Sequence, residues 1–418
     1  MPASADFQQR LETRLNAIVA HFGTPFHIYD EKGIKLTCNE LNRAFSGIPG
    51  FREFFAVKAL PNPSVMHILR TQGFGFDCSS IPELMLSRRL GASGGDIMFT
   101  SANTSQEEYV EALGDEGCLL NLDDISFVAK VPKMPELICF RYNPGSRRTG
   151  NSIIGNPVEA KYGVAHDQIL EAYRRAIVRG AARFGLHSML ASNERKYSYM
   201  VETARMLLEL AEWISAELSI QFEFINIGGG LGIPYRPEEN RLDIQSMARE
   251  ITALFDAFKE RHGYAPKMYM ESGRYITGPH GILVTRAINR KEIYRNYVGV
   301  DACMSALMRP GMYGAYHHIT VAGKSGAEEI VDVMGSLCEN NDKFAIQRSL
   351  PATQDGDILL IHDTGAHGIA MGFNYNGKLR PKELLLREDG AVELIRREER
   401  VEDYFATLEF EPDRLELG

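Results

Sequence analysis

The sequence predicts an α/β barrel followed by an all-β domain. Between residues 31 and 282, short apolar runs rich in β-forming residues alternate with longer helical patterns, as in parallel βα units. Eight such runs over about 250 residues match the size of a (β/α)8 TIM barrel. After residue 282 the helical periodicity almost vanishes. A chain of 418 residues also exceeds the size at which one core usually stops growing, so we expect two domains.

The segment before the barrel predicts a helix and then a strand. Apolar residues recur at helical spacing from Phe7 to Phe22, and the pattern ends at Gly23. Acidic residues within this stretch make it unlike a signal peptide. The run TPFHIYD (24–30) is strand-like and precedes the barrel helices, so we expect it to join the β-domain.

The barrel strands are predicted where β-rich runs end in polar or small residues. An open, doubly wound sheet is the alternative architecture for the same alternation. The eight predicted strands are FREFFAVKA (51–59), FGFDCSS (74–80), DIMFTSA (96–102), CLLNLDD (118–124), LICFRYN (137–143), FGLHSML (184–190), EFINIGGG (223–230) and KMYMESG (267–273).

The β-domain is predicted from strand-like runs separated by clusters of Gly, Pro, Asn and Asp. These runs are ILVTRAINRKEI (282–293), YVGVDA (297–302), HHITVAG (317–323), EEIVDVMG (328–335) and DILLIHD (357–363). We therefore expect a barrel over residues 31–282 that is inserted into a β-domain formed by residues 1–30 and 283–418.

Composition argues against several classes of function. The formal charge of −9 is spread along the chain without a basic patch, which disfavours a nucleic-acid partner. No apolar run is long enough to cross a membrane. The six cysteines lack the spacing of a metal site or a disulfide framework. We expect a cytoplasmic protein with reduced thiols and no metal.

Lys58 is the first candidate for catalysis. In barrel enzymes the active site lies at the C-terminal ends of the strands, and Lys58 ends the first strand within the apolar run FFAVKA. Burial would lower the pKa of its ammonium toward the neutral, nucleophilic amine that Schiff-base chemistry requires. The alternative is a lysine that keeps its head group in water or meets a carboxylate.

A glycine-rich turn follows the seventh strand. The run INIGGGLGIPY (225–235) contains Gly228, Gly229 and Gly230, where backbone without side chains can bring N–H groups onto a phosphate. By itself such a cluster is more often only a tight turn. Ser192, after the sixth strand, could donate to the same phosphate.

Other strand ends carry charged and aromatic side chains. Glu271 and Arg274 end the eighth strand in ESGRY, and Asp77 ends the second. A carboxylate facing a pyridine nitrogen would keep it protonated, and an arginine can reach a phosphate or a substrate carboxylate. A plain ion pair is the alternative. His187 could lie flat on a cofactor ring or act as a base, although a lone histidine is more often a core residue.

Together these residues make the chain resemble the diaminopimelate decarboxylases. The diaminopimelate decarboxylases belong to the barrel-type, pyridoxal-phosphate (PLP)-dependent group that includes ornithine and arginine decarboxylases. The resemblance covers about residues 23–386 and implies the alanine-racemase-like architecture called fold type III. The matching blocks, in the family's order, are FAVKA, FDCSSIPEL, GLHSMLASN, INIGGGLGIPY, VDACMSALMRPGMYGAYHHI, VMGSLCENNDKF and IHDTGAHGIAMGFNYNGKLRP.

The resemblance assigns roles to residues of both domains. It implies that Lys58 binds PLP covalently, that His187 stacks on the ring and that Glu271 pairs with its nitrogen. Asp77 is also a cofactor-binding candidate. The phosphate would be held by Ser192, Gly228, Gly229, Gly230, Gly273 and Arg274. The substrate-binding positions would be Arg274, Arg309, Tyr313, Glu339 and His367, with His367 also touching the cofactor.

The resemblance also implies a homodimer with shared active sites. Cys338, the family's proton donor, and Glu339 would enter the active site of a second subunit. The implied reaction is decarboxylation of meso-2,6-diaminopimelate to L-lysine and CO2, a step of lysine biosynthesis catalysed by a carboxy-lyase.

Four positions depart from the family's pattern. His367 replaces the usual tyrosine, Asn340 the usual serine, Ser272 a proline, and Met189 a histidine. Alternatives therefore stay open: a related decarboxylase acting on ornithine, lysine, arginine or a carboxylated polyamine precursor, or an inactive regulatory homologue. Arg309 favours diaminopimelate, because a simple diamine precursor has no distal carboxylate to bind. Glu271 argues against an alanine racemase, which normally sets an arginine against the pyridine nitrogen.

Overall fold

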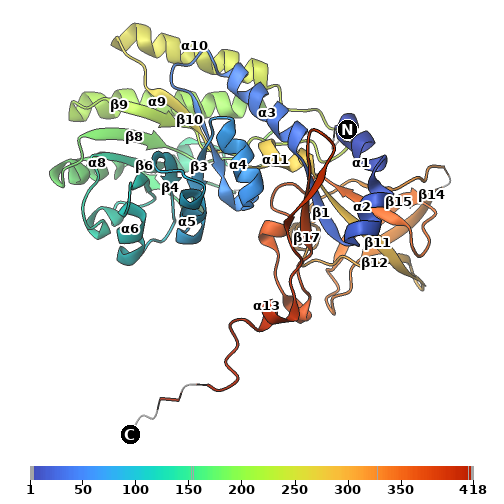
Figure 1. Cartoon of the computed structure of the whole chain (residues 1–418). Helices are drawn as coiled ribbons and strands as arrows, with labels where there is room; N and C mark the ends of the chain where they lie inside the picture. Colours follow the sequence, from blue (N-terminus) through green and yellow to red (C-terminus); the bar gives the residue numbers. More distant parts are fainter. Residues whose placement is uncertain (1–3, 152, 154, 327, 413, 416–418) are drawn as a thin grey trace.

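The chain folds into a closed parallel barrel and a separate β-sheet domain, which confirms the predicted fold class. The computed structural model describes residues 4–151, 153, 155–326, 328–412 and 414–415. Figure 1 shows the barrel with its helices on one side of the molecule and the second sheet on the other. Helices α1 (Ala5–Glu12) and α2 (Leu15–Phe22) pack beside the second sheet.

All eight predicted barrel strands are present. They follow the order β5-β4-β3-β2-β10-β9-β8-β6 with parallel pairing throughout, and the β5–β6 pairing closes the barrel. A short strand, β7 (Val164–Ala165), extends β6. The barrel strands are β2 (Arg52–Ala56), β3 (Gly75–Cys78), β4 (Gly94–Phe99), β5 (Cys118–Leu122), β6 (Leu137–Asn143), β8 (Arg183–His187), β9 (Phe222–Asn226) and β10 (Lys267–Met270).

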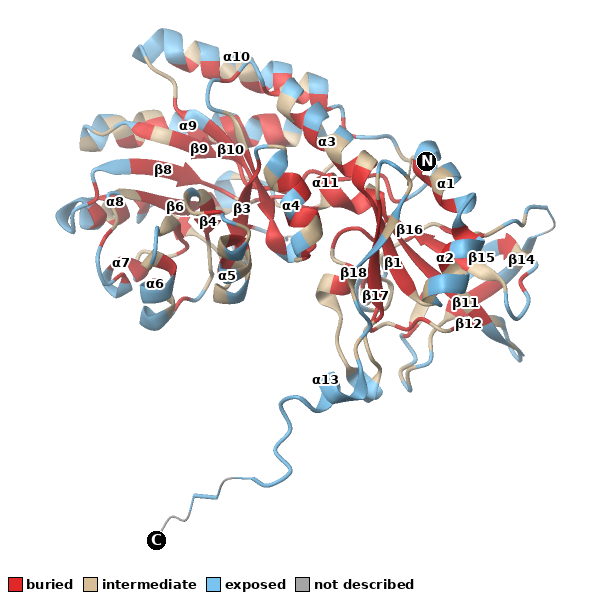
Figure 2. Ribbon diagram, viewed as in Figure 1, coloured by how far each residue is buried: buried red, intermediate tan, exposed pale blue. Residues whose placement is uncertain are grey.

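Helices cover the outside of the barrel, and the largest cluster of buried apolar residues lies between them and the strands. Figure 2 shows this burial as helices with one buried face over almost wholly buried strands. The helices are α3 (Glu31–Ala44), α4 (Pro63–Thr71), α5 (Ile81–Arg89), α6 (Gln106–Leu113), α7 (Phe127–Lys130), α8 (Ile169–Val178), α9 (Tyr197–Leu218), α10 (Ile244–His262) and α11 (Arg274–Thr277), with the short 3-10 helices η1 (Val57–Ala59), η2 (Gly145–Arg147) and η3 (Gly278–His280).

Large side chains fill the barrel interior. Phe54, Phe224 and Tyr269 belong to one small buried cluster in which their rings contact one another. Glycines on neighbouring strands make room for them, since a Cβ at Gly75 would meet Phe54 and a Cβ at Gly185 would meet Phe224. The interior is therefore a packed core, and the cavity next to it lies beyond the strand ends.

The β-domain contains the five strands predicted after residue 281 and three that the sequence did not reveal, β15, β17 and β18. β1 joins this sheet as predicted, antiparallel to β11 and parallel to β17. The elements are β1 (Phe26–Asp30), β11 (Gly281–Glu292), β12 (Asn296–Val300), β13 (Ile319–Val321), β14 (Glu328–Met334), β15 (Lys343–Pro351), β16 (Ile358–His362), β17 (Lys382–Leu386), β18 (Val392–Arg396), α12 (Arg309–Tyr313), α13 (Val401–Phe405), η4 (Ile369–Met371) and η5 (Tyr375–Gly377). We propose residues 31–282, and residues 1–30 with 283–418, as the two domains.

The N-terminal segment departs from the single helical pattern of the sequence. It forms two helices that are interrupted at Thr13 and Arg14, and Gly23 ends the second with a φ of 70°. Phe7, Leu11, Leu15 and Ile18 still share one buried cluster. The break therefore keeps the apolar side chains on the sheet while the helix changes direction.

Buried histidines predict that the protein loses stability in acid. Burial lowers the pKa of His280 to about 3, and its Nε2 lies 2.8 Å from the Thr37 hydroxyl. An unfolded histidine has a pKa of about 6.5, so the neutral ring favours the folded state above that pH and this contribution is lost as the pH falls toward 3. Lowering the pH from 7 to 5 should cost about 2 kcal/mol at this residue.

We expect His280→Gln to reduce that cost, measured as a smaller drop in the free energy of unfolding between pH 7 and pH 5. His67→Gln, at an exposed position of α4, is the matched control and should leave the pH dependence unchanged. An identical pH dependence in both variants and the unmodified chain would contradict the assignment.

Candidate active site

A cavity of about 530 Å³ lies at the C-terminal ends of the barrel strands. Side chains from β2, β3, β6 and β8 and from the loops after them reach it, as the barrel architecture predicts. Nine of the residues predicted from the sequence line this cavity: Lys58, Asp77, His187, Ser192, Gly230, Glu271, Gly273, Arg274 and His367.

Lys58 lies in η1, directly after β2, and half of its side chain is exposed, toward the cavity that it lines. Its Nζ is 3.2 Å from Oδ2 of Asp77 and 3.5 Å from the Ser79 hydroxyl. The carboxylate of Asp77 raises the pKa of Lys58, against the effect of burial. The expectation that burial would depress this pKa is therefore wrong, because the neighbouring strand supplies a counter-ion.

Asp77 itself is almost completely buried. Burial, together with the nearby carboxylate of Glu271, raises the pKa of Asp77 to about 6. Cys78 and Ser80, at the same strand end, do not line the cavity, and the Cys78 thiol contacts the Ser87 hydroxyl instead. Asp77 and Ser79, which alternate with Cys78 and Ser80 along the chain, therefore line the site.

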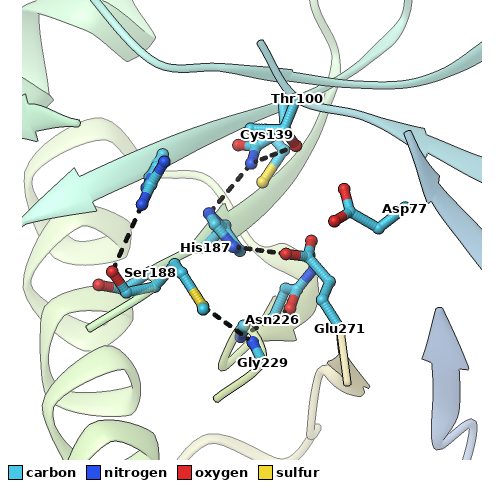
Figure 3. Close-up of polar contacts among 12 residues, drawn as sticks. Asp77, Thr100, Cys139, His187, Ser188, Asn226, Gly229 and Glu271 are labelled. Atoms are coloured by element: carbon cyan, nitrogen blue, oxygen red, sulfur yellow. Dashed lines mark hydrogen bonds and ion pairs between the residues drawn. The ribbon is translucent and has the colours of Figure 1, made fainter. Parts of the chain in front are cut away.

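His187 lies between an amide and a carboxylate, and Figure 3 shows the contact of its ring with the carboxylate of Glu271. Nδ1 is 3.0 Å from the amide nitrogen of Asn121, and Nε2 is 3.1 Å from Oε2 of Glu271. Because the carboxylate accepts, Nε2 carries a proton that it donates to Glu271. These two contacts fix the plane of the ring, which lines the cavity.

Glu271 is held by neutral and cationic neighbours. The Asn226 amide donates to its Oε1 at 2.7 Å. Although burial opposes ionisation, His187 and Lys58 lower the pKa of Glu271 below its usual value. The site thus contains a buried, ionised carboxylate next to an imidazole.

The glycine-rich turn is shaped by close backbone contacts. A Cβ at Gly228, Gly229 or Gly230 would meet the carbonyl oxygen of Ser188, Glu271 or Ala191, respectively, and Gly228 and Gly230 have positive φ angles. The Gly228 N–H donates to the Asn226 side chain and the Gly229 N–H lies against the Met189 sulfur. Of the three, only Gly230 lines the cavity.

A second cavity of about 680 Å³ continues from the first. Ser192, Arg274 and His367 line both, and Arg309 and Tyr313 line the second alone. Burial, and then the charges of Arg274 and Arg309, lower the pKa of His367 well below its usual value, so its ring is neutral. The amine of Lys58 and the carboxylate of Glu271 therefore line the first cavity, whereas Arg309 lines the second and Arg274 lines both.

Cys338 and Glu339 lie outside both cavities. Cys338 is exposed in the loop between β14 and β15, where its N–H donates to the Asn376 side chain. Glu339 Oε1 accepts from the Asn341 N–H within the same loop. Within one chain, the structure does not bring these two residues to Lys58.

Sequence reasoning missed several residues of the site. Asn121, Asn226 and Arg141 stand at or near the ends of β5, β9 and β6, so the strand-end rule that found Lys58 could have found them. Arg141 pairs with Asp123 at 3.2 Å and lines the first cavity. Tyr235 has no such signal, because it lies in the loop beyond the glycines.

The residues present fit PLP. Lys58 offers an amine, Glu271 a carboxylate for a pyridine nitrogen, and Arg274 a guanidinium for a phosphate. Two buried oxygens in this region, Asp77 Oδ1 and Asn121 Oδ1, have no hydrogen-bond partner among the described residues. Polar atoms left unpaired beside a cavity are what a polar ligand would satisfy.

The part of the chain that the structure describes has no helix long and apolar enough to cross a bilayer. Within the same residues, no group of three or more His, Cys, Asp or Glu side chains could hold a metal ion.

Comparison with known proteins places these features in a family. Residues 32–278 match the family model described as the pyridoxal-binding domain of pyridoxal-dependent decarboxylases. The chain is 39% identical over 394 residues to diaminopimelate decarboxylase of Methanothermobacter thermautotrophicus, covering 91% of each chain. It is 47% identical over 414 residues to Protein TabA of Pseudomonas amygdali pv. tabaci, covering 99% of this chain and 97% of that protein. The name TabA states no substrate.

Solved structures show the same architecture. The structure of M. jannaschii diaminopimelate decarboxylase in complex with L-lysine superposes with a TM-score of 0.88 and 29% identity, covering 94% of this chain and 93% of that chain. Helicobacter pylori diaminopimelate decarboxylase complexed with L-lysine gives a TM-score of 0.85 at 27% identity, covering 94% of this chain and 98% of that one.

Proposed function

The chain belongs to the pyridoxal-dependent decarboxylases, and from that premise we propose that it converts meso-2,6-diaminopimelate into L-lysine and CO2. Members of the family are PLP-dependent lyases, and this chain is accordingly a PLP-dependent decarboxylase that acts on an amino acid. The observation that carries the choice of diaminopimelate is a buried arginine without an acidic partner.

Arg309 is 8% exposed at the start of α12, and burial lowers the pKa of its guanidinium. Its Nη1 contacts the Tyr235 hydroxyl at 3.0 Å and His317 Nε2 at 2.8 Å, which are both neutral groups. No carboxylate lies within ion-pair distance of it among the described residues. A buried cation without a counter-ion is costly, so a substrate carboxylate at this position is favoured. Diaminopimelate carries such a carboxylate at its distal end.

In this proposal the residues of the first cavity bind the cofactor, and the reacting end of the substrate lies next to it. Bound PLP supplies the electron sink that allows an α-carboxylate to leave as CO2. Lys58 carries the cofactor, and ionised Glu271 holds a proton at the pyridine nitrogen. His187, whose imidazole is held by Asn121 and Glu271, would support the cofactor ring. The phosphate would be held by Ser192, Gly230, Gly273 and Arg274, which line the cavity, while Gly228 and Gly229 shape the turn that positions Gly230.

The proposal includes a homodimer with shared active sites. Cys338, which is exposed, and Glu339 lie on the loop between β14 and β15, and neither lines a cavity of its own chain. A second copy that inserts this loop would bring a thiol, able to hand a proton to the α-carbon, and a carboxylate for the distal ammonium.

The proposed substrate is tested by CO2 release from a panel of amino acids. With PLP-loaded protein, meso-diaminopimelate should be turned over with the highest kcat/KM, and L-lysine should accumulate. Ornithine, lysine and arginine are the competing substrates of the same panel. Faster turnover of ornithine or lysine would overturn the proposal and leave the decarboxylase class intact.

Replacing Arg309 tests the distal contact directly. Arg309→Gln should cost about 2–5 kcal/mol of transition-state binding for diaminopimelate, because a buried charge-assisted contact is lost. The measurement is kcat/KM with diaminopimelate. Arg175→Gln, on the exposed face of α8, removes an arginine that pairs with Glu171 outside both cavities and should have no effect. Equal values for the two variants would contradict a role for Arg309 in substrate binding.

A further inference from the structure

Tyr235 lies where two cationic side chains meet. It follows the glycine-rich turn, is 7% exposed and lines the second cavity. Its hydroxyl oxygen accepts from Arg274 Nη1 at 2.5 Å and from Arg309 Nη1 at 3.0 Å. The guanidinium carbons of these arginines are 5.7 Å and 4.7 Å from the centre of its ring. One phenol thus links the arginine of the first cavity to the arginine of the second.

His317 fixes this cluster from the other side. Its Nδ1 donates to the His362 carbonyl oxygen at 2.8 Å, so Nε2 has the lone pair that accepts from Arg309 at 2.8 Å. Burial, and then the charge of Arg309, lower the pKa of His317 to about 3, so the ring is neutral. Its ring meets that of Tyr235 edge-on at 5.2 Å. The partners of Arg309 therefore orient the guanidinium without cancelling its charge.

The hydroxyl proton of Tyr235 remains to be placed. The phenol oxygen already accepts two N–H groups, so its own O–H must point to a third group. None of the described residues accepts it, and no carboxylate lies within ion-pair distance of Arg274 or Arg309 in this part of the chain. The hydroxyl, Arg274 and Arg309 thus form a cluster of donors that faces the cavity and lacks an anion.

We propose that Tyr235 is a substrate-binding and positioning residue: its hydroxyl donates to the distal carboxylate of an amino dicarboxylic acid, while its oxygen sets the positions of Arg274 and Arg309. This inference rests on the proposed function, since it requires a substrate with a distal carboxylate. The distal carboxylate would then accept from Tyr235, Arg274 and Arg309. Of these three donors, the sequence led us to expect only the two arginines.

Two ligands separate this role from a structural one. L-lysine, the product, keeps the distal carboxylate, whereas 1,5-diaminopentane is the same molecule without it. Tyr235→Phe removes only the hydroxyl and keeps the ring that packs on His317. Binding of both ligands to the PLP-loaded protein is measured from the change in its visible absorbance. We expect Tyr235→Phe to weaken lysine binding about 10-fold to 100-fold, as for a lost hydrogen bond to a charged group.

Binding of 1,5-diaminopentane should change by less than about 2-fold, and the KM for diaminopimelate should rise more than kcat falls. Tyr173→Phe is the matched control, because it removes a buried hydroxyl that donates to the Gly185 carbonyl oxygen away from both cavities. It should lower the melting temperature and leave both affinities unchanged. Equal weakening of both ligands by Tyr235→Phe, or of neither, would overturn the inference.

If Tyr235→Phe does not fold, a second pair of variants still tests the inference. Gln and Met have similar shapes, but only Gln offers an N–H donor. Tyr235→Gln should keep more of the preference for lysine over 1,5-diaminopentane than Tyr235→Met does, and equal preferences would count against the inference. A wild-type chain that does not turn over diaminopimelate defeats the proposed function instead, so the two failures are distinguishable.

Discussion

Replacing Lys58 with alanine is expected to remove covalently bound PLP and to lower decarboxylation by at least about three orders of magnitude, because Lys58 supplies the amine that lies beside Asp77 at the strand ends. The unmodified protein, incubated with PLP, should absorb in the visible and lose this band on treatment with borohydride. Peptide mapping after reduction should find the adduct at Lys58.

Lys130→Ala serves as the control for Lys58→Ala, since Lys130 ends α7 outside both cavities. It should retain both the absorbance and the activity. A reducible adduct that persists in Lys58→Ala at another lysine would show that the cofactor position is wrongly assigned. Loss of the adduct without loss of activity would contradict the catalytic role.

Replacing Cys338 with alanine should lower turnover by about 100-fold to 10,000-fold, the usual contribution of a positioned general acid. Folding and PLP binding should be nearly unchanged, because Cys338 is exposed and outside both cavities. The measurements are kcat, the melting temperature and the visible absorbance. Cys118→Ala, at the start of β5, is the control and should keep full activity.

Mixing inactive chains tests whether the site is shared. When Lys58→Ala and Cys338→Ala chains re-associate at random, half of the dimers are mixed, and each mixed dimer has one complete site. About a quarter of the wild-type activity should therefore return. Mixed dimers that demonstrably form and stay inactive, while wild-type chains treated identically remain active, would rule out the shared-site model.

The order of elements was predictable because it depends on local pattern. Each of the eight barrel runs combines an apolar β-rich stretch with a following helical period, and both signals lie within a few residues. The short strands β17 and β18 were missed because their five-residue runs gain stability from β1 and from each other rather than from a distinctive pattern. β15 was missed although it is longer, and two register shifts interrupt its pairing with β14.

The chemistry of the site was predictable only in part. The strand-end rule brought Lys58, Asp77, His187 and Glu271 together, and the structure places all four around one cavity. The charge state of Lys58 was not predictable, since it depends on a carboxylate 3.2 Å away on the next strand. Burial alone predicts a lowered pKa, and the ion pair reverses the direction.

The sequence by itself determined the barrel, the β-domain and the residue types at the strand ends, because these follow from periodicity and from the polarity of a parallel barrel. Only the tertiary structure decided which side chains meet. Tyr235 lies in a loop of the barrel and Arg309 begins helix α12 of the β-domain, 74 residues later, yet the Tyr235 hydroxyl contacts Arg309. Such contacts depend on how the β-domain packs over the strand ends, and no local pattern records that geometry.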